Sequence, residues 1–394
     1  MINDEFIVHQ KIHHSSFITH HYFNILKQII ITFGILIFIL SCDETKPVNP
    51  TVDDTDLSQI AYSPTPITLK RPQGFTEMPI PADNPMTTEG IELGRRLFYD
   101  PILSRDSSMS CSSCHLPNGA FTDNKALSTG IDGKAGTRSA MSLENVGFVK
   151  SGLFWDGGTK TLEEQALLPV EDPIEMHHVW EKVQEILRGH KDYPTYFRKA
   201  FGIKNKSEIT KMLATKALAQ FERSLISGNA KIDKILRKEE VFTDEEFNGF
   251  LLFFNDDPKK DAQCGHCHGA PFYGSNEFFN NGIDSVKTLN DFKDKGLGRI
   301  TGKPFDMGKF RTPSLRNIEF TAPYMHDGRF KTLDEVMNHY ASGGHLADNI
   351  SPFIPLIKEI KMTAKQKSEI IAFMKTLSDT SFMHNPNLQN PFKK

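Results

Sequence analysis

The sequence predicts a mainly α-helical protein whose folded body consists of two similar domains. The pattern Cys-x-x-Cys-His occurs twice, as CSSCH at Cys111–His115 and as CGHCH at Cys264–His268. Apolar residues recur at spacings of three and four, whereas the strict alternation typical of strands is scarce. Because each half of the body contains one pattern, we predict an N-terminal domain over residues 86–230 and a C-terminal domain over residues 231–394.

Length and composition are those of a globular protein. The 394 residues are enough for two domains of ordinary size, each with its own core. Charged residues make up 24% of the chain and the net charge is -3. Such a small net charge gives no basis for binding nucleic acid, so we expect no nucleic-acid partner.

The N-terminus has the features of an export signal. An apolar run, IIITFGILIFIL, covers residues 29–40 and is too short to cross a bilayer comfortably. The overlapping ILSC ends at Cys42 and resembles a bacterial lipobox, in which the cysteine is acylated. We therefore expect residues 1–42 to be a signal peptide of the lipoprotein type, with a chance cysteine as the alternative. Residues 43–85, rich in Pro, Thr and Asp, predict a tether. The expected location is the periplasm or cell envelope, with membrane contact only through the lipid.

Helical signals are clearest in three places. In residues 206–227 one buried helix face is predicted by the apolar positions Ile209, Met212, Leu213, Ala217, Phe221 and Leu225. Capping boxes that begin helices are predicted at Thr243 with Glu246 and at Thr363 with Gln366. Long connections rich in Gly, Pro and Asn fill much of the remaining chain, as is common in proteins that wrap a cofactor.

Three chemistries compete for a Cys-x-x-Cys pair. Structural zinc needs four ligands close together, but here the two pairs are separated by about half the chain. A redox dithiol has no use for the histidine that follows. Covalent c-type haem attachment uses all three residues, with two thioethers and one axial iron ligand. We predict two c-type haems, one bound through Cys111, Cys114 and His115 and one through Cys264, Cys267 and His268. His266, inside the second motif, is expected to face solvent.

Two longer stretches, Phe154–Met176 and Phe310–Gly344, resemble the bacterial di-haem cytochrome c peroxidases and their relatives of the MauG type. The likeness extends from about Pro85 to about Leu377. It implies two cytochrome c-like domains with a haem on either side of their interface. The N-terminal haem is then the peroxide site, and the C-terminal haem receives or stores electrons.

The resemblance also implies roles for individual residues. Trp155 is the residue between the haems, and Glu175 and Gln165 lie over the peroxide-binding face. Glu175 transfers a proton between the peroxide oxygens and Gln165 orients the ligand, while Pro169 restricts the space. From the residues alone, Glu175 would be a solvated loop acid and Trp155 a core residue.

The chain departs from the usual family pattern at two positions. Many members carry a histidine that caps the peroxide haem, whereas Ile131 holds the matching position in STGIDGKAGTRSA. The first haem is therefore expected to be open without prior reduction. At the distal position of the second haem the resemblance places Tyr340, as in MauG-type enzymes, with Met337 as the competing ligand. His339 is expected on another side of the same helix.

Further implications concern metals and partners. Thr321 and Pro323 match two carbonyl donors of a calcium ion, but Ser139 stands where asparagine is usual. Arg311 and Arg316 are candidates for pairing with haem propionates, with surface arginines as the alternative, and His326 is expected to shape the second haem pocket. Members of the family are often dimers, so a homodimer is an additional expectation.

Three functions follow from these observations. The first is reduction of hydrogen peroxide at the N-terminal haem, with electrons that a small cytochrome c or another redox protein delivers through the C-terminal haem. The second is MauG-like, peroxide-dependent oxidation of residues on a partner protein, which Ile131 and Tyr340 favour. The third is a non-catalytic di-haem electron carrier, which would need both irons to be saturated by protein ligands.

Overall fold

The computed structural model describes residues 55–255 and 262–393. The predicted signal peptide, the Cys42 anchor and the first part of the tether therefore lie outside the described residues. Within the described ranges, no helix is both long enough and apolar enough to cross a membrane.

Helices dominate the described chain, as the sequence predicts. The first six α-helices are α1 (Thr88–Tyr99), α2 (Leu162–Gln165), α3 (Leu168–Glu171), α4 (Trp180–Gly189), α5 (Tyr193–Phe201) and α6 (Lys211–Arg223). The next seven are α7 (Lys231–Leu236), α8 (Asp244–Phe254), α9 (Gly298–Thr301), α10 (Leu333–Ser342), α11 (Phe353–Ile360), α12 (Ala364–Lys375) and α13 (Thr380–Met383). Two short strands, β1 (Phe278–Phe279) and β2 (Phe310–Arg311), pair antiparallel with Phe279 opposite Phe310.

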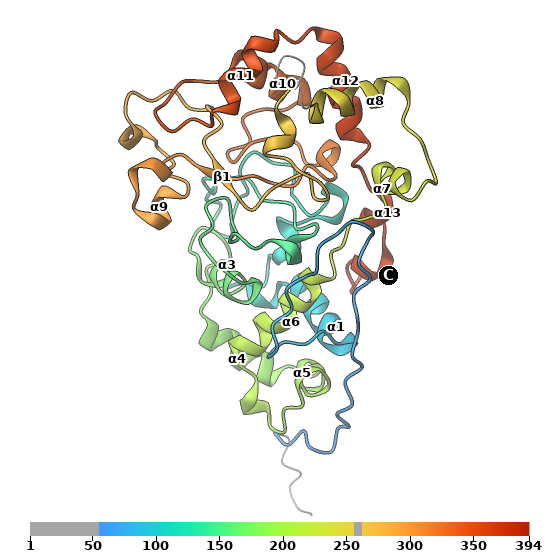
Figure 1. The fold of residues 1–394 in the computed structure, drawn as a ribbon. Helices are drawn as coiled ribbons and strands as arrows, with labels where there is room; N and C mark the ends of the chain where they lie inside the picture. The colour runs from blue at the N-terminus through green and yellow to red at the C-terminus, as the bar shows by residue number, and fades with distance from the viewer. Residues whose placement is uncertain (1–54, 256–261, 394) are drawn as a thin grey trace, which may run out of the picture. The chain divides into compact units, whose positions relative to one another are not determined.

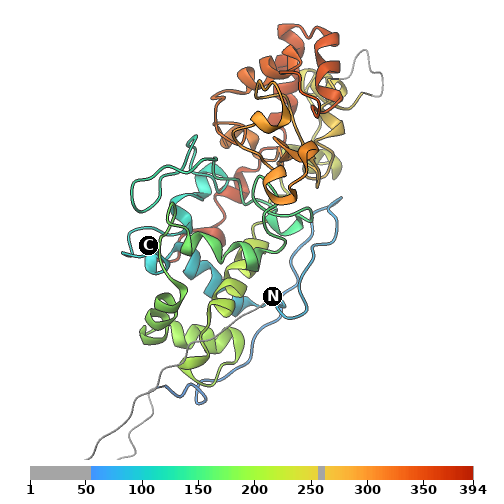
Figure 2. The ribbon, with the colours of Figure 1, turned by 90° about the vertical axis from the view of Figure 1, so that its left-hand side faces the viewer.

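The apolar side chains form two main cores. One is built from residues of α1, α4, α5 and α6, and the other is built around α8 and α12. Figure 1 shows these two groups of helices separately, and the turned view in Figure 2 keeps them apart. Phe382, Met383 and Leu388 return to the first core, so the end of the chain packs on the N-terminal unit. The boundary at residue 230 remains a prediction, which the two cores support.

Each core depends on one glycine where two helices cross. A Cβ atom on Gly94 of α1 would lie 1.9 Å from the carbonyl oxygen of Ala217 in α6. A Cβ atom on Gly249 of α8 would lie 1.9 Å from the carbonyl oxygen of Glu369 in α12. Only glycine allows backbones to approach this closely. The same device in both halves indicates that the two units are built alike.

Local sequence signals identify several helix ends correctly. The capping boxes at Thr243 and Thr363 both form, and each hydroxyl accepts a hydrogen bond from the backbone N–H three residues later. The predicted helix in residues 206–227 is α6, which begins after its N-cap Thr210. Met212 does not belong to the buried face, because its side chain is 45% exposed.

The described part of the predicted tether, residues 55–85, is packed against the body. Leu57 and Phe75 are each 5% exposed, and Phe75 contacts the rings of Phe148 and Phe272 edge-on. Two isolated bridges, Asp56 to Asn205 and Pro66 to Thr87, add backbone hydrogen bonds. This correction has a simple cause: a few well-spaced apolar residues are sufficient to hold an otherwise polar segment on a core surface.

An internal repeat that is faint in the sequence becomes clear in the structure. The segment WDGGTKTLEE, which starts at Trp155, corresponds to HDGRFKTLDE, which starts at His326. In both copies the residue before the motif has a positive φ, 60° at Phe154 and 77° at Met325. Both copies then enter a helix through a threonine capping box. Trp155 and His326 therefore occupy equivalent positions in the two units.

Candidate functional site

Both Cys-x-x-Cys-His motifs have the same local structure. The cysteine pairs lie around the 3-10 helices η2 (Cys111–Ser113) and η6 (Cys264–His266). After each helix the histidine Nδ1 is hydrogen-bonded to a backbone carbonyl, 2.8 Å from Phe121 O for His115 and 2.9 Å from Tyr273 O for His268. This contact fixes the ring and leaves Nε2 as the nitrogen that could bind iron.

The cysteines are not poised for thiol redox chemistry. Burial raises the pKa of Cys111 and Cys114, and it raises the pKa of Cys267 to about 11. A reactive dithiol needs the opposite shift, because the thiolate is the nucleophile. Among residues 55–255 and 262–393, no three His, Cys, Asp or Glu side chains gather as a metal-binding group. The raised thiol pKa values argue against a redox dithiol.

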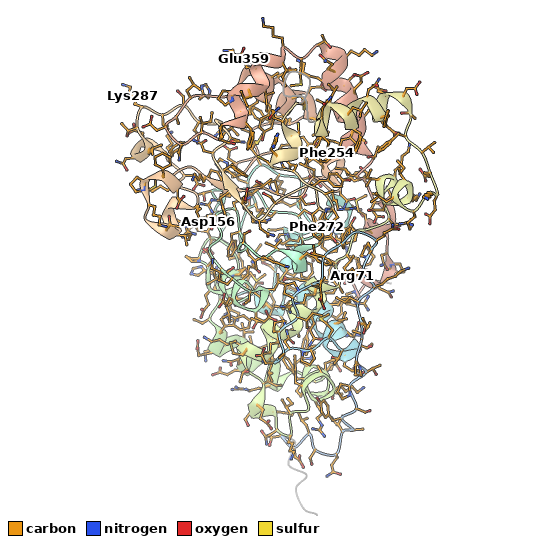
Figure 3. The ribbon with its side chains drawn as sticks, in the orientation of Figure 1. Arg71, Asp156, Phe254, Phe272, Lys287 and Glu359 are labelled. Carbon is orange, nitrogen blue, oxygen red and sulfur yellow. The ribbon has the colours of Figure 1, made fainter. Side chains whose placement is uncertain are left out.

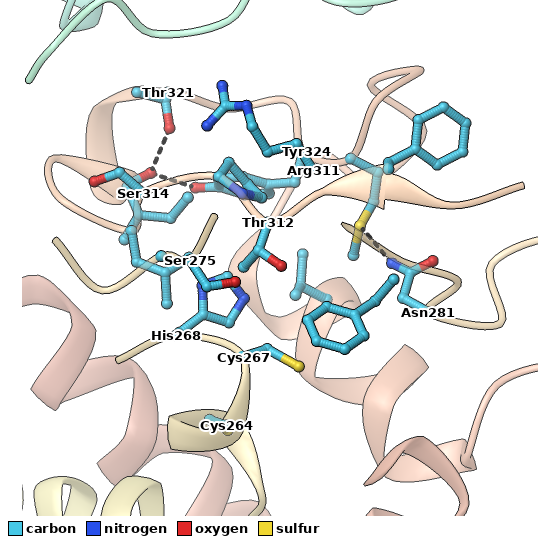
Figure 4. Close-up of a pocket in the computed structure, with 18 of the residues that line it drawn as sticks. Cys264, Cys267, His268, Ser275, Asn281, Arg311, Thr312, Ser314, Thr321 and Tyr324 are labelled. Atoms are coloured by element: carbon cyan, nitrogen blue, oxygen red, sulfur yellow. Dashed lines mark hydrogen bonds between the residues drawn. The ribbon is translucent and has the colours of Figure 1, made fainter. Parts of the chain in front are cut away.

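The second motif opens into a mostly apolar cavity of about 280 Å³. Figure 4 shows His268 and Cys267 beside this space, with Arg311 across the cavity from them. The predicted site residues that the structure brings together around this cavity are Cys264, Cys267, His268, Trp155, Met337, Tyr340, Thr321 and Pro323.

Arg311 makes this cavity suitable for a haem. Its side chain is 8% exposed, and it forms no ion pair with any residue that the structure describes. Its nearest polar contacts are the Phe154 carbonyl at 3.4 Å and the Met141 sulfur at 3.5 Å. Burial lowers the pKa of Arg311 to about 10, so an anion such as a haem propionate would stabilise it. Arg316 serves a different purpose, because its guanidinium binds both carboxylate oxygens of Asp233 at 2.8 and 2.9 Å.

Tyr340 and Met337 both reach the cavity from α10. The Tyr340 hydroxyl lies 3.4 Å from the Asn281 side-chain amide, and burial raises the pKa of Tyr340 to about 12. Met337 is 3% exposed and belongs to the second apolar core. His339 turns elsewhere and lies 3.1 Å through Nε2 from the Asn281 carbonyl. The repeat aligns Tyr340 with Pro169. Tyr340 lies 14 residues after His326, and Pro169 lies 14 residues after Trp155.

Trp155 is held by the backbone of two neighbouring segments. Its indole N–H donates to the Ser139 carbonyl at 2.9 Å, and its own carbonyl accepts from Arg311 N–H at 2.8 Å. Ser139 N–H donates in turn to the carbonyl of His326 at 2.8 Å. Two segments that lie far apart in sequence, around Ser139 and around Arg311, thus fix the Trp155 ring in the cavity wall.

The residues expected over the first motif lie in one folded segment. Gln165 ends α2 with a half-buried side chain, and Pro169 lies in the first turn of α3. The Pro169 carbonyl accepts a hydrogen bond from Met176 N–H, directly after Glu175. The negative charge of Glu175 contributes to the raised pKa of both Cys111 and Cys114, which places its carboxylate on their side of the fold.

Glu175 is exposed at the surface of this segment. Its side chain is exposed, yet the surrounding protein is dense enough for burial, together with the charge of Asp172, to raise its carboxyl pKa to about 7. A carboxyl group with this pKa can accept and return a proton near neutral pH. This is the property that a peroxide-cleaving acid–base group needs.

The loop that contains Ile131 is fastened to the Glu175 segment. Ile131 N–H donates to the Glu175 carbonyl at 2.9 Å. Asp132 binds both Arg105 and His177, at 2.5 and 2.6 Å. Gly130 must be glycine, because a Cβ there would lie 1.7 Å from the Ile174 carbonyl oxygen. Ile131 is therefore placed beside the proposed peroxide residues.

The proposed calcium donors also lie at the cavity wall. Ser139, Thr321 and Pro323 all line it, and the Ser139 hydroxyl donates to the Met325 carbonyl at 3.0 Å. His266 is exposed, as expected, and its ring stacks on Phe353 at 4.3 Å.

The sequence analysis did not identify two residues of the site, Asn281 and Glu144, or the repeat that contains Glu144. Asn281 beside Tyr340 gave no motif signal. Glu144 is 4% exposed at the cavity wall, with Asn317 as hydrogen-bond partner and a pKa that burial raises to about 7. It lies in SLENVGF, a second repeat matched by SLRNIEF from Ser314. A search of the chain against itself would have found this repeat.

Two Cys-x-x-Cys-His motifs on a two-unit fold, together with a carboxyl group whose pKa is raised to about 7, define a class of di-haem redox enzyme. Residues 88–241 match the family described as di-haem cytochrome c peroxidase. A cytochrome-c peroxidase, IdrP1, of Pseudomonas sp. (strain SCT) is 32% identical over 329 residues, which cover 76% of this chain and 84% of that protein. The methylamine utilization protein MauG of Methylorubrum extorquens is 32% identical over 325 residues, 82% of this chain and 86% of MauG.

Solved structures agree with these sequence relatives. The crystal structure of a MauG-like protein associated with microbial copper homeostasis has a TM-score of 0.77 and 35% identity, and the match covers 83% of this chain and all of that one. The diheme peroxidase BthA of Burkholderia thailandensis shares the fold, with a TM-score of 0.62 at 20% identity. The chain belongs to the di-haem cytochrome c peroxidase family, and its activity is that of a peroxidase-type oxidoreductase. Membership of this di-haem family implies two c-type haems.

Proposed function

We propose that the protein reduces hydrogen peroxide at the site of His115 with electrons that enter through the site of His268. The bound haems supply the redox-active iron at both sites. The observation that carries this direction is the asymmetry of the two units. The phenol of Tyr340 reaches into the cavity of the second motif, whereas the equivalent position in the first unit holds Pro169, six residues before Glu175.

Glu175 acts on the peroxide proton. The carboxylate accepts a proton from the inner peroxide oxygen and returns it to the outer one, which then leaves as water. Two electrons that enter through the site of His268 and two protons from solvent convert the inner oxygen to the second water. Gln165 holds the ligand by its side-chain amide, and Pro169 limits the space above it. Ile131 has no atom that binds iron, so the space stays open without a preceding reduction step.

Tyr340 is the proposed distal ligand of the second haem, and Trp155 connects the two sites. Burial keeps the Tyr340 phenol protonated when no cation is bound. A bound iron would displace that proton and bind the phenolate oxygen. Asn281, 3.4 Å from the hydroxyl, would donate a hydrogen bond to it. A phenolate favours oxidised states of a metal, whereas the thioether of Met337 would favour reduction.

Tyr340 also favours a second candidate function, the oxidation of residues on a partner protein. Relatives named MauG are as similar to this chain as relatives named peroxidase. The two functions share the peroxide step and differ only in what gives up the electrons. A turnover assay with a small cytochrome c as donor separates them.

The remaining proposals concern location and assembly. The periplasmic location of the family's cytochromes supports export by a signal in residues 1–42, with a lipid at Cys42. Calcium at Thr321 and Pro323 and a homodimer are additional proposals. Loss of the lipid in a Cys42→Ala variant, measured by mass spectrometry, would test the anchor.

Spectroscopy of the ferric holoprotein tests the central proposal. A high-spin signal before any addition, followed by a new near-infrared band after stoichiometric peroxide without reductant, is the expected result. A fully low-spin ferric protein that reacts only after partial reduction would contradict the proposed roles of Ile131 and Tyr340.

A further inference from the structure

His326 separates two spaces. One is the cavity beside His268 described above, here called the haem-side cavity, and the other is a pocket of about 1020 Å³, here called the outer pocket. The outer pocket is lined mainly by loop residues of the second unit, together with Thr137 and Arg138 from the first. The proposed peroxide chemistry makes no use of it. A concave site of this size suits a small molecule.

Ion pairs between arginines and aspartates neutralise most of the charge that lines this pocket. Five cationic side chains line it, along with four aspartates. Arg138 binds Asp294 and the buried Asp156, and Arg329 binds Asp284 and Asp327. In the described structure Lys293 and Lys295 have no ion-pair partner. The lining therefore offers two uncommitted cations among carboxylates that accept hydrogen bonds, which fits a monoanion that carries hydroxyl groups.

His326 joins this pocket to the haem-side cavity. Its side chain is 6% exposed, lines both spaces and makes no hydrogen bond to any described residue. The ring stacks on Phe310, with centroids 3.7 Å apart and planes at 13°. Arg311, the next residue, donates its N–H to the carbonyl of Trp155. A molecule in the outer pocket would thus touch His326, whose ring stacks on Phe310 in the wall of the cavity beside His268.

We propose that the outer pocket binds a small, polyhydroxylated, monoanionic reductant of the ascorbate class, and that its electrons enter the second haem site past His326 and Phe310. This inference deepens the proposed function and rests on it. The ascorbate monoanion loses two electrons and one proton to become dehydroascorbate. Peroxide takes up two electrons and two protons to give two water molecules, and the additional proton comes from solvent.

The test compares two lysine pairs in the holoprotein. Lys293→Ala with Lys295→Ala removes both uncommitted cations, whereas Lys287→Ala with Lys303→Ala removes two exposed lysines that do not line the pocket. Figure 3 shows Lys287 on an outer loop. Peroxide-dependent loss of ascorbate absorbance gives KM, and calorimetry with gulonate, a redox-inert monoanion with hydroxyl groups, measures binding directly. Haem spectra confirm that each variant is loaded.

The expected result is saturable ascorbate turnover in the wild type and a KM about tenfold higher in the Lys293/Lys295 variant, with weaker gulonate binding. The Lys287/Lys303 control should match the wild type. Equal KM values in the two variants, or ascorbate rates that never saturate while tetramethylphenylenediamine still drives peroxide reduction, would overturn the pocket proposal alone. Absence of peroxide turnover with both donors in the wild type would instead refute the proposed function.

Discussion

Replacing Glu175 by glutamine tests the proposed proton transfer most directly. The substitution keeps the size of the side chain and removes its ability to titrate. General acid–base groups typically contribute about 10²- to 10⁴-fold to a rate. The rate at which the ferric protein reacts with peroxide, measured by stopped-flow absorbance, should therefore fall at least about hundredfold in Glu175→Gln.

The pH dependence gives a sharper form of the same prediction. Burial, with a smaller contribution from Asp172, raises the Glu175 carboxyl pKa to about 7. Only the ionised carboxylate accepts a proton, so the wild-type rate should rise with pH through about 7 and then level off. The residual rate of Glu175→Gln should be flat over this range. A wild-type rate that falls as pH rises through 7 would contradict the assignment.

Asp172→Asn is the matched control because it removes the like charge and keeps the Oδ1 that accepts from Ile174 N–H at 2.8 Å. For two like charges about 6 Å apart at an effective dielectric constant of about 40–80, Coulomb's law gives about 0.7–1.4 kcal/mol. The midpoint of the pH profile should therefore move about 0.5–1 pH unit lower, since 1.36 kcal/mol corresponds to about one unit. A Glu175→Gln protein with the wild-type rate, or an Asp172→Asn midpoint that does not move down, would refute this reasoning.

Three additional predictions concern the second cavity and the fold. Tyr340→Phe should change the electron paramagnetic resonance spectrum of the low-spin ferric haem. Met337→Leu should leave that spectrum unchanged. The reverse result would show that Met337 is the ligand. Gly249→Ala should lower the free energy of unfolding in guanidinium by about 1–3 kcal/mol, because α8 and α12 must separate, whereas Gly189→Ala, with no atom within 4 Å of the new Cβ, should have little effect. Equal effects would show that the helix crossing tolerates the Cβ. Burial raises the pKa of Glu222 from 4.5 to about 8, so its contribution to stability is present below about 4.5 and is lost as pH rises to 8. Glu222→Gln should be more stable than wild type at pH 8 and should lose less stability between pH 5 and 8; a steeper loss would contradict this.

Much of the haem-binding framework could be predicted because each signal depends on neighbouring residues. The Cys-x-x-Cys-His motifs and the capping boxes at Thr243 and Thr363 need only a few consecutive positions. The packed state of residues 55–85 could not be predicted in this way, since it depends on Phe75 meeting Phe148 and Phe272, which lie far away in sequence.

The surroundings of the predicted site residues were harder to predict for the same reason. Asn281 approaches Tyr340 across 59 positions of the chain, and no pattern in either segment indicates the contact. Arg311 and Arg316 look equivalent in FRTPSLRN, yet only Arg316 has a buried carboxylate partner. Whether a buried arginine is paired or available for an anion depends on a distant aspartate, Asp233, which local sequence does not reveal.

The internal repeat explains how one scaffold supports two different sites. In the second unit, α10 runs unbroken from Leu333 to Ser342 and carries Tyr340 into the cavity. The equivalent segment of the first unit is interrupted between α2, which ends at Gln165, and α3, which starts at Leu168. Pro169 at the position of Tyr340 has no backbone N–H to donate to residue 165, and its ring is incompatible with a continuous helix there.

The difference between Pro169 and Tyr340 therefore affects both the course of the backbone and the chemistry of the two sites. Proline removes a side chain that could reach iron and breaks the helix, so the chain turns and brings Glu175 back to the Ile131 loop. Tyrosine keeps the helix and supplies a phenol. In the proposed function, this one difference between the repeats distinguishes the peroxide site of the first unit from the phenol-containing site of the second.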